Sequence, residues 1–215
     1  MNETQNASKT WLGVGLAVLF IAVLVVIFIY RAQKPEPIPA PASYAKYTAM
    51  DNSFTCDQPQ GWVTQSGASG GINSGVLFQR NSAKIDITTD LAGSLMGDIT
   101  KAQNAQLGDM APGMTGDLKS PVEKLHEQGA AGMKEKLSNY QELPYKKFDS
   151  GTGEACSSEY TGNGGLLVGK VHGYRVTMLS SERRVTIICQ CPESSWEALK
   201  PTFRRVILSF QAMRG

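Results

Sequence analysis

The stretch VTIICQCPESSWEALKPTFRRVILSF, residues 185–210, decides the fold. Branched aliphatic residues and cysteines occupy alternate positions from Val185 to Cys191, which is the two-residue period of a strand with one buried face. A capping box from Ser194 to Glu197 follows at once and predicts a helix. The apolar side chains that this helix would bury are Trp196, Leu199 and Phe203. The sequence therefore predicts a strand that runs directly into a closing helix.

Before this stretch, strand patterns occur in runs and do not alternate with helices. Residues 54–62 (FTCDQPQGW) predict a short strand, and residues 75–89 predict a hairpin that turns at Arg80–Ser82. A capped helix begins at Ser120, and a longer β region covers residues 147–191. Such an order is typical of the α+β class with an antiparallel β-sheet. No glycine fingerprint joins a strand to a helix, which disfavours a doubly wound nucleotide-binding fold.

Three stretches carry a resemblance to a known family: FTCDQPQGW (54–62), GVLFQR with AKIDITTDL (75–80 and 83–91), and above all residues 185–210. Together they resemble the PsbP-like superfamily, which also includes the Ran-binding import factors of the Mog type. The resemblance covers Tyr47 to Phe210. It implies an α/β/α sandwich, in which helices flank the antiparallel sheet, and a non-catalytic accessory role. The surfaces that bind photosystem II and Ran have no recognisable match here, so neither partner is carried over.

Residues 11–30 (WLGVGLAVLFIAVLVVIFIY) form an apolar run without a charged residue. A helix of this length measures about 30 Å, which matches the hydrocarbon core of a bilayer. Trp11 and Tyr30 stand at its two ends, where aromatic rings prefer the headgroup level. We therefore expect an N-terminal tail over residues 1–10 and a single transmembrane helix over residues 11–30.

A proline-rich segment follows the expected anchor. PEPIPAPAS (35–43) favours polyproline II, so residues 31–46 are expected to form a semi-rigid linker before a domain over residues 47–215. Residues 40–42 (APA) resemble a signal-peptide cleavage site, but the apolar run is too long for a signal peptide and ends well before them. Flanking basic residues favour a cytoplasmic domain, whereas an anchor with a proline spacer is usual for an exported one. We expect the domain on the extracytoplasmic side.

Charge argues against one class of partner. The chain has 21 Lys and Arg against 19 Asp and Glu, a formal net charge of +2. A mixed, nearly neutral surface lacks the electrostatic footprint of a nucleic-acid-binding protein. We therefore expect no nucleic-acid partner.

The cysteines allow several roles. Cys189 and Cys191 share one face of the expected strand, and residues two apart on a strand lie about 6.5–7 Å from each other, at or beyond the disulfide limit. Either could pair instead with Cys56 or Cys156 on a neighbouring strand, so structural disulfides and buried free thiols both remain open. The spacing lacks the paired CxxC knuckles of a four-cysteine zinc site, and no metal is expected.

An enzyme is the alternative to a binding protein. Its candidate nucleophiles are Cys189 and Cys191, for thiol redox chemistry, and Ser69, whose GASGG context matches the hydrolase pattern G-x-S-x-G. A hydrolase serine needs a strand before it and a helix after it, whereas this segment reads as a loop between two strands. His126 and His172 stand apart from any carboxylate pattern. We therefore assign no catalytic residue and no cofactor.

Two glycine-rich segments, residues 65–75 and 108–119, form the predicted contact surface, since loops on a rigid scaffold often carry recognition. The residues expected to bind a partner there are Ser69, Gly70, Gly71, Met110 and Met114. The sequence thus predicts a membrane-anchored, non-catalytic binding or assembly module for a protein partner.

Overall fold

The computed structural model describes residues 19–24, 36–69, 73–91, 119–151, 153–165, 169–180 and 183–213. The chain divides into two compact units, Met1–Glu36 and Pro37–Gly215. In the first unit residues 19–24 are helical, and the rest of the expected transmembrane helix lies outside the described residues. Within the described ranges, no helix is both long enough and apolar enough to cross a membrane.

The second unit alternates runs of strands with single helices. The first run comprises β1 (Tyr44–Thr48), β2 (Phe54–Pro59), β3 (Val63–Ser69), β4 (Asn73–Arg80) and β5 (Ala83–Leu91). Helix α3 (Pro121–Lys136) precedes the second run: β6 (Ser138–Glu142), β7 (Lys146–Asp149), β8 (Glu154–Asn163), β9 (Lys170–Leu179) and β10 (Arg183–Pro192). The 3-10 turn η2 (Glu193–Ser195), helix α4 (Trp196–Ser209) and strand β11 (Gln211–Ala212) close the unit. This order confirms the α+β class.

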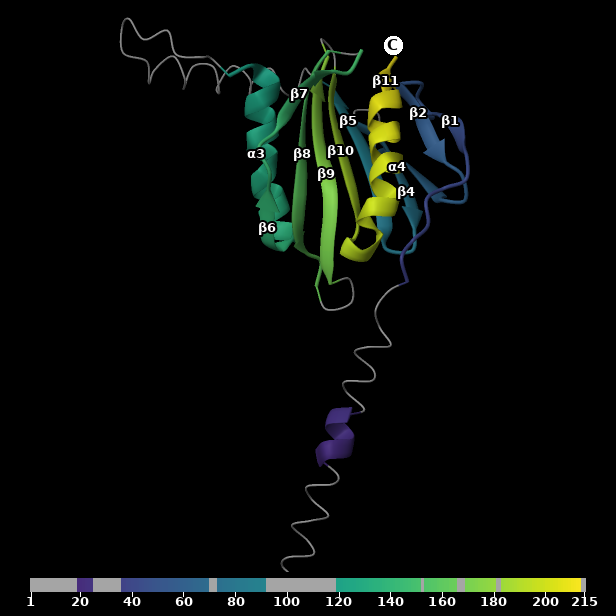
Figure 1. Ribbon diagram of the computed structural model, residues 1–215. Helices are drawn as coiled ribbons and strands as arrows, with labels where there is room; N and C mark the ends of the chain where they lie inside the picture. The colour runs from purple at the N-terminus through teal and green to yellow at the C-terminus, as the bar shows by residue number, and fades with distance from the viewer. Residues whose placement is uncertain are drawn as a thin grey trace, which may run out of the picture. The chain divides into compact units, whose positions relative to one another are not determined.

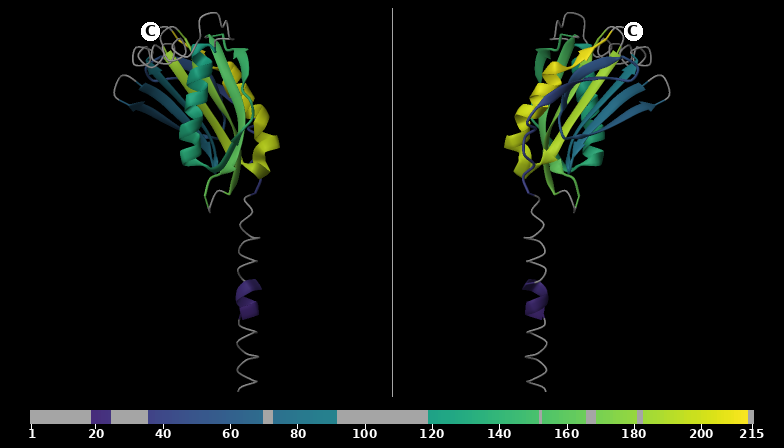
Figure 2. Two further views of the ribbon diagram at one scale, coloured as in Figure 1. Left: turned by 90° about the vertical axis from the view of Figure 1, so that its left-hand side faces the viewer. Right: turned by 90° about the vertical axis from the view of Figure 1, so that its right-hand side faces the viewer.

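The strands form two antiparallel sheets. Within the described residues the larger sheet has eight strands in the order β3-β4-β5-β10-β9-β8-β6, and β7 pairs with the other half of the outer edge of β8. The smaller sheet has the order β1-β2-β11. Helix α3 covers one face of the larger sheet, while α4 and the smaller sheet cover the other (Figures 1 and 2). The result is the layered arrangement that the resemblance implies.

The strand predicted from residues 185–191 is β10, which lies in the middle of the larger sheet between β5 and β9. Its alternation is confirmed, because one set of side chains enters the main core beneath α4: Val185, Ile187, Cys189 and Cys191. Helix α4 contributes to the same core Trp196, Leu199, Phe203 and Val206. A smaller core lies under α3 and contains Met133, Leu137, Tyr160 and Val171. The sequence pattern of residues 185–210 thus builds the centre of the domain.

The folded unit begins before the predicted boundary at Tyr47. It starts at Pro37, and Ile38 is buried in the main core. The Ile38 backbone N–H donates a hydrogen bond to Ser195 Oγ over 2.9 Å, and β1 already begins at Tyr44. The alternating prolines predict a spacer, but the burial of one isoleucine among them makes residues 37–46 part of the domain.

The sequence predicts the start of α3 better than that of α4. At α3 the N-cap is Ser120, and its N–H donates to Glu123 Oε2 over 2.7 Å, as the predicted capping box requires. At α4 the N-cap is Ser195 and not Ser194. The difference arises because residues 193–195 form η2, and because the Ser195 hydroxyl accepts the hydrogen bond from Ile38.

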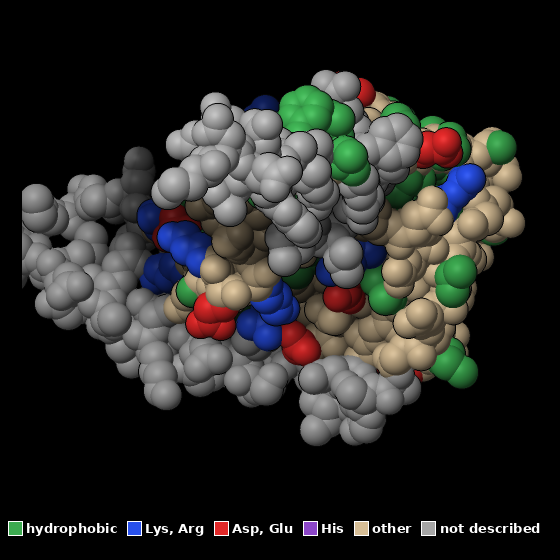
Figure 3. Space-filling model, turned by 90° about the horizontal axis from the view of Figure 1, so that it is seen from below, with side chains coloured by type: hydrophobic (Ala, Val, Ile, Leu, Met, Phe, Trp, Pro, Cys, Tyr) green, Lys and Arg blue, Asp and Glu red, His purple; other side chains and the backbone are tan. Residues whose placement is uncertain are grey.

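Cationic and acidic side chains lie side by side on the described surface at the end of the domain seen from below (Figure 3). Ion pairs among the described residues include Lys170 Nζ with Glu193 Oε1 at 3.5 Å and Arg205 Nε with Asp57 Oδ2 at 2.9 Å. This intermingling follows from the near balance of acidic and basic residues in the sequence.

Candidate binding groove

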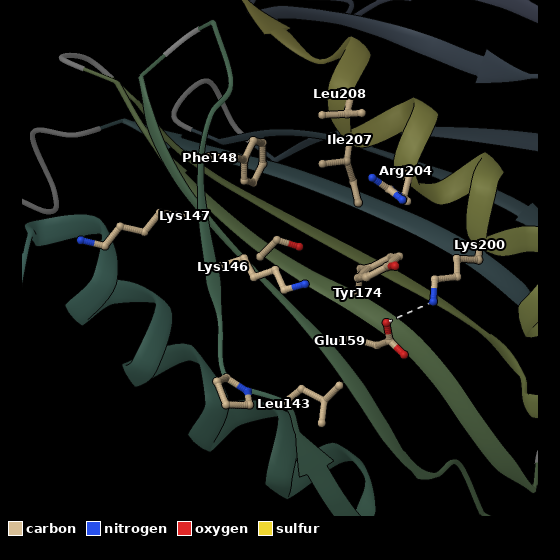
Figure 4. A pocket seen from close by; sticks show the side chains of 12 residues that line it. Leu143, Lys146, Lys147, Phe148, Glu159, Tyr174, Lys200, Arg204, Ile207 and Leu208 are labelled. Atoms are coloured by element: carbon tan, nitrogen blue, oxygen red, sulfur yellow. Dashed lines mark ion pairs between the residues drawn. The ribbon is translucent and has the colours of Figure 1, made fainter.

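A groove of about 440 Å³ lies between α4 and β7, over β8 and β9 (Figure 4). The apolar side chains that line it are Leu143, Pro144, Phe148, Tyr174, Ile207 and Leu208. The charged residues around it are Lys146, Lys147, Glu159, Lys200 and Arg204. The groove therefore combines an apolar lining with more cations than carboxylates.

Helical spacing explains the wall formed by α4. Lys200, Arg204 and Leu208 follow one another at four-residue steps, so they share one face of the helix beside the face that enters the core. Leu208 is 63% exposed although it is a large apolar residue. The sequence contains this signal, a basic and apolar stripe next to the buried stripe of the helix.

Strand alternation explains the opposite wall. Lys146 and Phe148 of β7 lie on the α4 face of the sheet and point into the groove (Figure 4). Lys147 lies on the other face, where its Nζ is 2.8 Å from Glu123 Oε2 of α3. Leu143, in the connection before β7, is 60% exposed at the same wall. The short edge strand β7 and the connection before it form this wall. The wall presents the positive charge of Lys146 and the apolar surface of Phe148 and Leu143.

The charges inside the groove are not balanced. Lys200 Nζ lies 3.5 Å from Glu159 Oε2, and the other oxygen of Glu159 lies 2.8 Å from His172 Nε2. The single lining carboxylate is thus already engaged. Among the described residues, no carboxylate forms an ion pair with Lys146 or Arg204, whose cationic groups face each other from opposite walls (Figure 4).

The floor of the groove is electrically neutral at Tyr174. Burial first, and the nearby Glu159 carboxylate second, raise the pKa of Tyr174 to about 12. Its ring centroid lies 5.1 Å from that of Trp196, which extends the aromatic surface beneath α4. The phenol therefore offers an uncharged hydrogen-bonding group beside the cations.

His172 lies next to the groove and fastens the start of α4 to the sheet. Its ring stacks on Trp196 with centroids 3.8 Å apart and planes inclined by 7°. Its Nε2 contacts Glu159 at 2.8 Å and its Nδ1 contacts Glu193 at 3.2 Å. Sequence reasoning missed this cluster because its members meet only in the fold. The described part of the chain holds no group of three or more His, Cys, Asp and Glu placed to bind a metal.

His126 is buried on the other side of the sheet, under α3. Its Nδ1 lies 3.0 Å from Thr177 Oγ1, and its Nε2 lies 2.6 Å from Ser158 Oγ. Glu142 approaches the same Nε2 at 3.8 Å. In a serine hydrolase the carboxylate holds the nitrogen opposite to the serine, so this cluster lacks the catalytic arrangement. It attaches α3 to β8 and β9.

Stability is expected to fall below about pH 6.5 because of His126. Burial first, and the charge of Arg175 second, lower the pKa of His126 from 6.5 to about 3. The unfolded chain takes up this proton near the ordinary pKa, whereas the folded chain resists it, so the contribution is complete above pH 6.5 and is lost progressively towards pH 3. The loss reaches at most about 1.4 kcal/mol per pH unit, measured by urea unfolding at a series of pH values.

The test variant is His126→Gln. Glutamine keeps polar groups near Ser158 and Thr177 but does not titrate, so His126→Gln should lose less stability than the wild type on acidification. Parallel losses in the wild type and in His126→Gln would contradict this assignment.

All four cysteines are buried and free. Cys56, Cys189 and Cys191 belong to the main core, while Cys156 lies on the opposite face of the sheet, two residues from the α3-contacting Ser158. The sheet therefore separates Cys156 from the other three. Burial raises the pKa of Cys191 to about 12 and that of Cys189 well above its usual value, which keeps both as unreactive thiols. Of the alternatives that the sequence left open, the structure contains the buried free thiols and none of the disulfides.

A maleimide reagent is expected to modify none of the four cysteines in the native protein and all four after unfolding without reductant. Burial in the native state and the absence of cross-links together give this pattern. Mass spectrometry of labelled protein counts the modified thiols. Labelling that requires reductant would reveal disulfides, and rapid labelling before unfolding would reveal an exposed thiol; either result contradicts the structure.

The expected partner-binding loops are only partly described. Ser69 is the last residue of β3 and pairs with Asn73 of β4, so its segment leads into a hairpin and not into a helix. The strand-to-helix turn of a hydrolase nucleophile is therefore not formed there. The other expected contact residues lie outside the described residues: Gly70, Gly71, Met110 and Met114. Their role in binding stays a prediction.

No protein-family model and no curated protein matches the chain. Among solved structures it is similar to the PsbP protein (CyanoP) of the cyanobacterium Synechocystis sp. PCC 6803, with a TM-score of 0.52 and 14% identity over 83% of this chain and 96% of that one. It is also similar to LpqN of Mycobacterium tuberculosis, a protein involved in cell envelope biogenesis, with a TM-score of 0.45 and 12% identity over 80% and 91% of the two chains. A likeness at this level of identity concerns the fold. The chain has a PsbP-like fold.

Proposed function

We propose that this protein is a membrane-anchored, non-catalytic binding module that holds its partner in the groove between α4 and β7. One observation carries the proposal. Lys146 and Arg204 face each other across an apolar groove, and no carboxylate of the described residues pairs with either. Exposing apolar side chains to water costs free energy. An exposed apolar patch beside unpaired charges is therefore typical of a binding site.

The properties of the alternative catalytic groups favour binding over catalysis. The thiols of Cys189 and Cys191 are buried and have raised pKa values, which is the opposite of what thiol redox chemistry needs. The hairpin position of Ser69 removes the support for a hydrolase. A binding function requires neither a nucleophile nor a cofactor.

The anchor is part of the proposal and rests on the apolar run of residues 11–30 with its aromatic ends. We place the globular unit on the extracytoplasmic side. A Met50→Cys variant tests this placement, because Met50 is 80% exposed and the native thiols are buried. A membrane-impermeant maleimide should label it in intact cells; labelling only after lysis would place the domain in the cytoplasm.

Site-specific photo-crosslinking tests the binding function. A benzoylphenylalanine at position 208, inside the groove, should capture a partner in living cells, whereas the same residue at position 50 should not. Arg204→Glu should abolish the capture, while Lys134→Glu on the exposed side of α3 should leave it unchanged. Equal capture at both positions, or capture that survives Arg204→Glu, would contradict a binding site in this groove.

A further inference from the structure

The charge and shape of the groove define the chemistry of its occupant. We propose that the groove binds an anionic phospholipid, with the headgroup between Lys146 and Arg204 and the acyl chain along Phe148 and Leu208. This inference rests on the proposed function and names the ligand of the same site.

The headgroup position follows from the balance of charge. Lys200 forms an ion pair with Glu159, and His172 contacts its other oxygen, so the carboxylate in the floor of the groove is already engaged. Lys146 and Arg204 then remain as positive charges on opposite walls, so an anion in the groove lies between them (Figure 4). A guanidinium binds a phosphate through a charge-assisted fork, and a lysine ammonium adds a point charge.

The acyl-chain position follows from the apolar lining. In the groove, Phe148, Ile207 and Leu208 gather on one side of the cations, and Leu143 lies on the other (Figure 4). Leu208 is 63% exposed, so an acyl chain laid against it and Phe148 would remove apolar surface from water. An inorganic anion would leave this surface uncovered.

The dimensions favour a lipid over an acidic peptide or protein. The volume of about 440 Å³ lies in the range of small-molecule sites. A peptide that added as a strand to the outer edge of β7 would find only 4 residues there, and the strand begins with two lysines. Short edge strands that carry lysine resist such addition.

The sequence also brings the domain close to lipid. The expected anchor ends at residue 30, and the folded unit begins at Pro37. The intervening residues span at most about 20 Å when fully extended. A chain anchored in this way cannot leave the membrane surface, so a phospholipid is a ligand that is always present.

The test uses the full chain reconstituted in discs of phosphatidylcholine that contain a phosphatidylglycerol with a diazirine on its acyl chain. Mass spectrometry then locates the labelled peptides. Labelling within residues 11–30 serves as an internal reference, because the anchor contacts the acyl chains of the disc. We expect additional labelling at residues 143–148 and 204–208.

Charge-reversed variants give the controls. The double variant Lys146→Glu/Arg204→Glu should lower the groove labelling, relative to residues 11–30, by about tenfold, the change that follows from the loss of about 1.4 kcal/mol. The matched variant Arg80→Glu/Lys134→Glu, which carries the same change of charge outside the groove, should label like the wild type. A diazirine-labelled phosphatidylcholine should label the groove much less than the phosphatidylglycerol.

Two results would overturn the lipid assignment: labelling confined to residues 11–30, or equal labelling of residues 143–148 and 204–208 by both lipids. Capture of a protein at position 208 without lipid labelling would retain the proposed binding function and reject the lipid. Absence of both lipid labelling and cross-linking at position 208 would reject both.

Discussion

Replacement of Gly173 with alanine is expected to destabilise the protein by about 3 kcal/mol or more, at the upper end of the cost of overpacking a core. Gly173 lies in β9 and pairs with Gln190 of β10 at the centre of the larger sheet. A Cβ at this position would overlap the carbonyl oxygen of Cys189 and lie 2.8 Å from Cζ of Tyr160. The ring is held over the glycine because its hydroxyl donates a hydrogen bond to the Cys189 carbonyl over 3.1 Å. The added methyl group must therefore separate β9 from β10 or expel the ring.

Urea unfolding measures this loss, and Gly67→Ala is the matched control. Gly67 also lies in a strand, β3, but a Cβ there would meet nothing within 4 Å. Its replacement should change stability by less than about 0.5 kcal/mol. If Gly173→Ala were as harmless as Gly67→Ala, the packing of Tyr160 against β9 would be wrong.

Removal of Glu142 is expected to destabilise the protein by about 3–5 kcal/mol, the cost of leaving a buried charge without its partner. Arg175 is 3% exposed, and its Nε and Nη2 lie 2.9 and 2.7 Å from Glu142 Oε1. Its Nη1 donates to the backbone carbonyl of His126 on α3. Glu142→Ala therefore leaves a guanidinium buried between α3 and the sheet with only part of its hydrogen bonds.

The control is the ion pair of Arg184 with Asp90, which also joins neighbouring strands but is more exposed. Asp90→Ala should cost no more than about 1 kcal/mol. The double variant Arg175→Met/Glu142→Leu should recover much of the loss, because apolar residues of similar size need no partner. A loss in Glu142→Ala no larger than that in Asp90→Ala would show that Arg175 reaches water.

The layered fold follows from local patterns that the sequence displays openly. Alternation in residues 185–191 defines the central strand, and the hairpin at Arg80–Ser82 and the cap at Ser120 appear where they are expected. These features depend on interactions between residues close in sequence, so the sequence alone predicts them. The domain boundary could not be read in this way, because Ile38 is buried by residues from the far end of the chain.

The candidate site could not be predicted for the same reason. The groove exists because β7 and α4, far apart in the sequence, form facing walls on one sheet. The sequence around Lys146 and around Arg204 contains no distinctive motif. The two residues stand out only in the fold, where no carboxylate of the described residues forms an ion pair with either. The cysteines show the reverse case, since their shared strand face and their burial were both visible in the alternation of β10.

The rate at which a maleimide labels Leu208→Cys in native membranes tests the central claim most directly. The buried native thiols contribute no background. If the groove is occupied, labelling should be slow, and it should become faster when Lys146→Glu/Arg204→Glu empties the groove. Added negative charge by itself would lower thiol reactivity, so it cannot produce this acceleration. Met50→Cys should label quickly in both backgrounds. Equal rates for Leu208→Cys in both backgrounds would contradict a binding role for the groove.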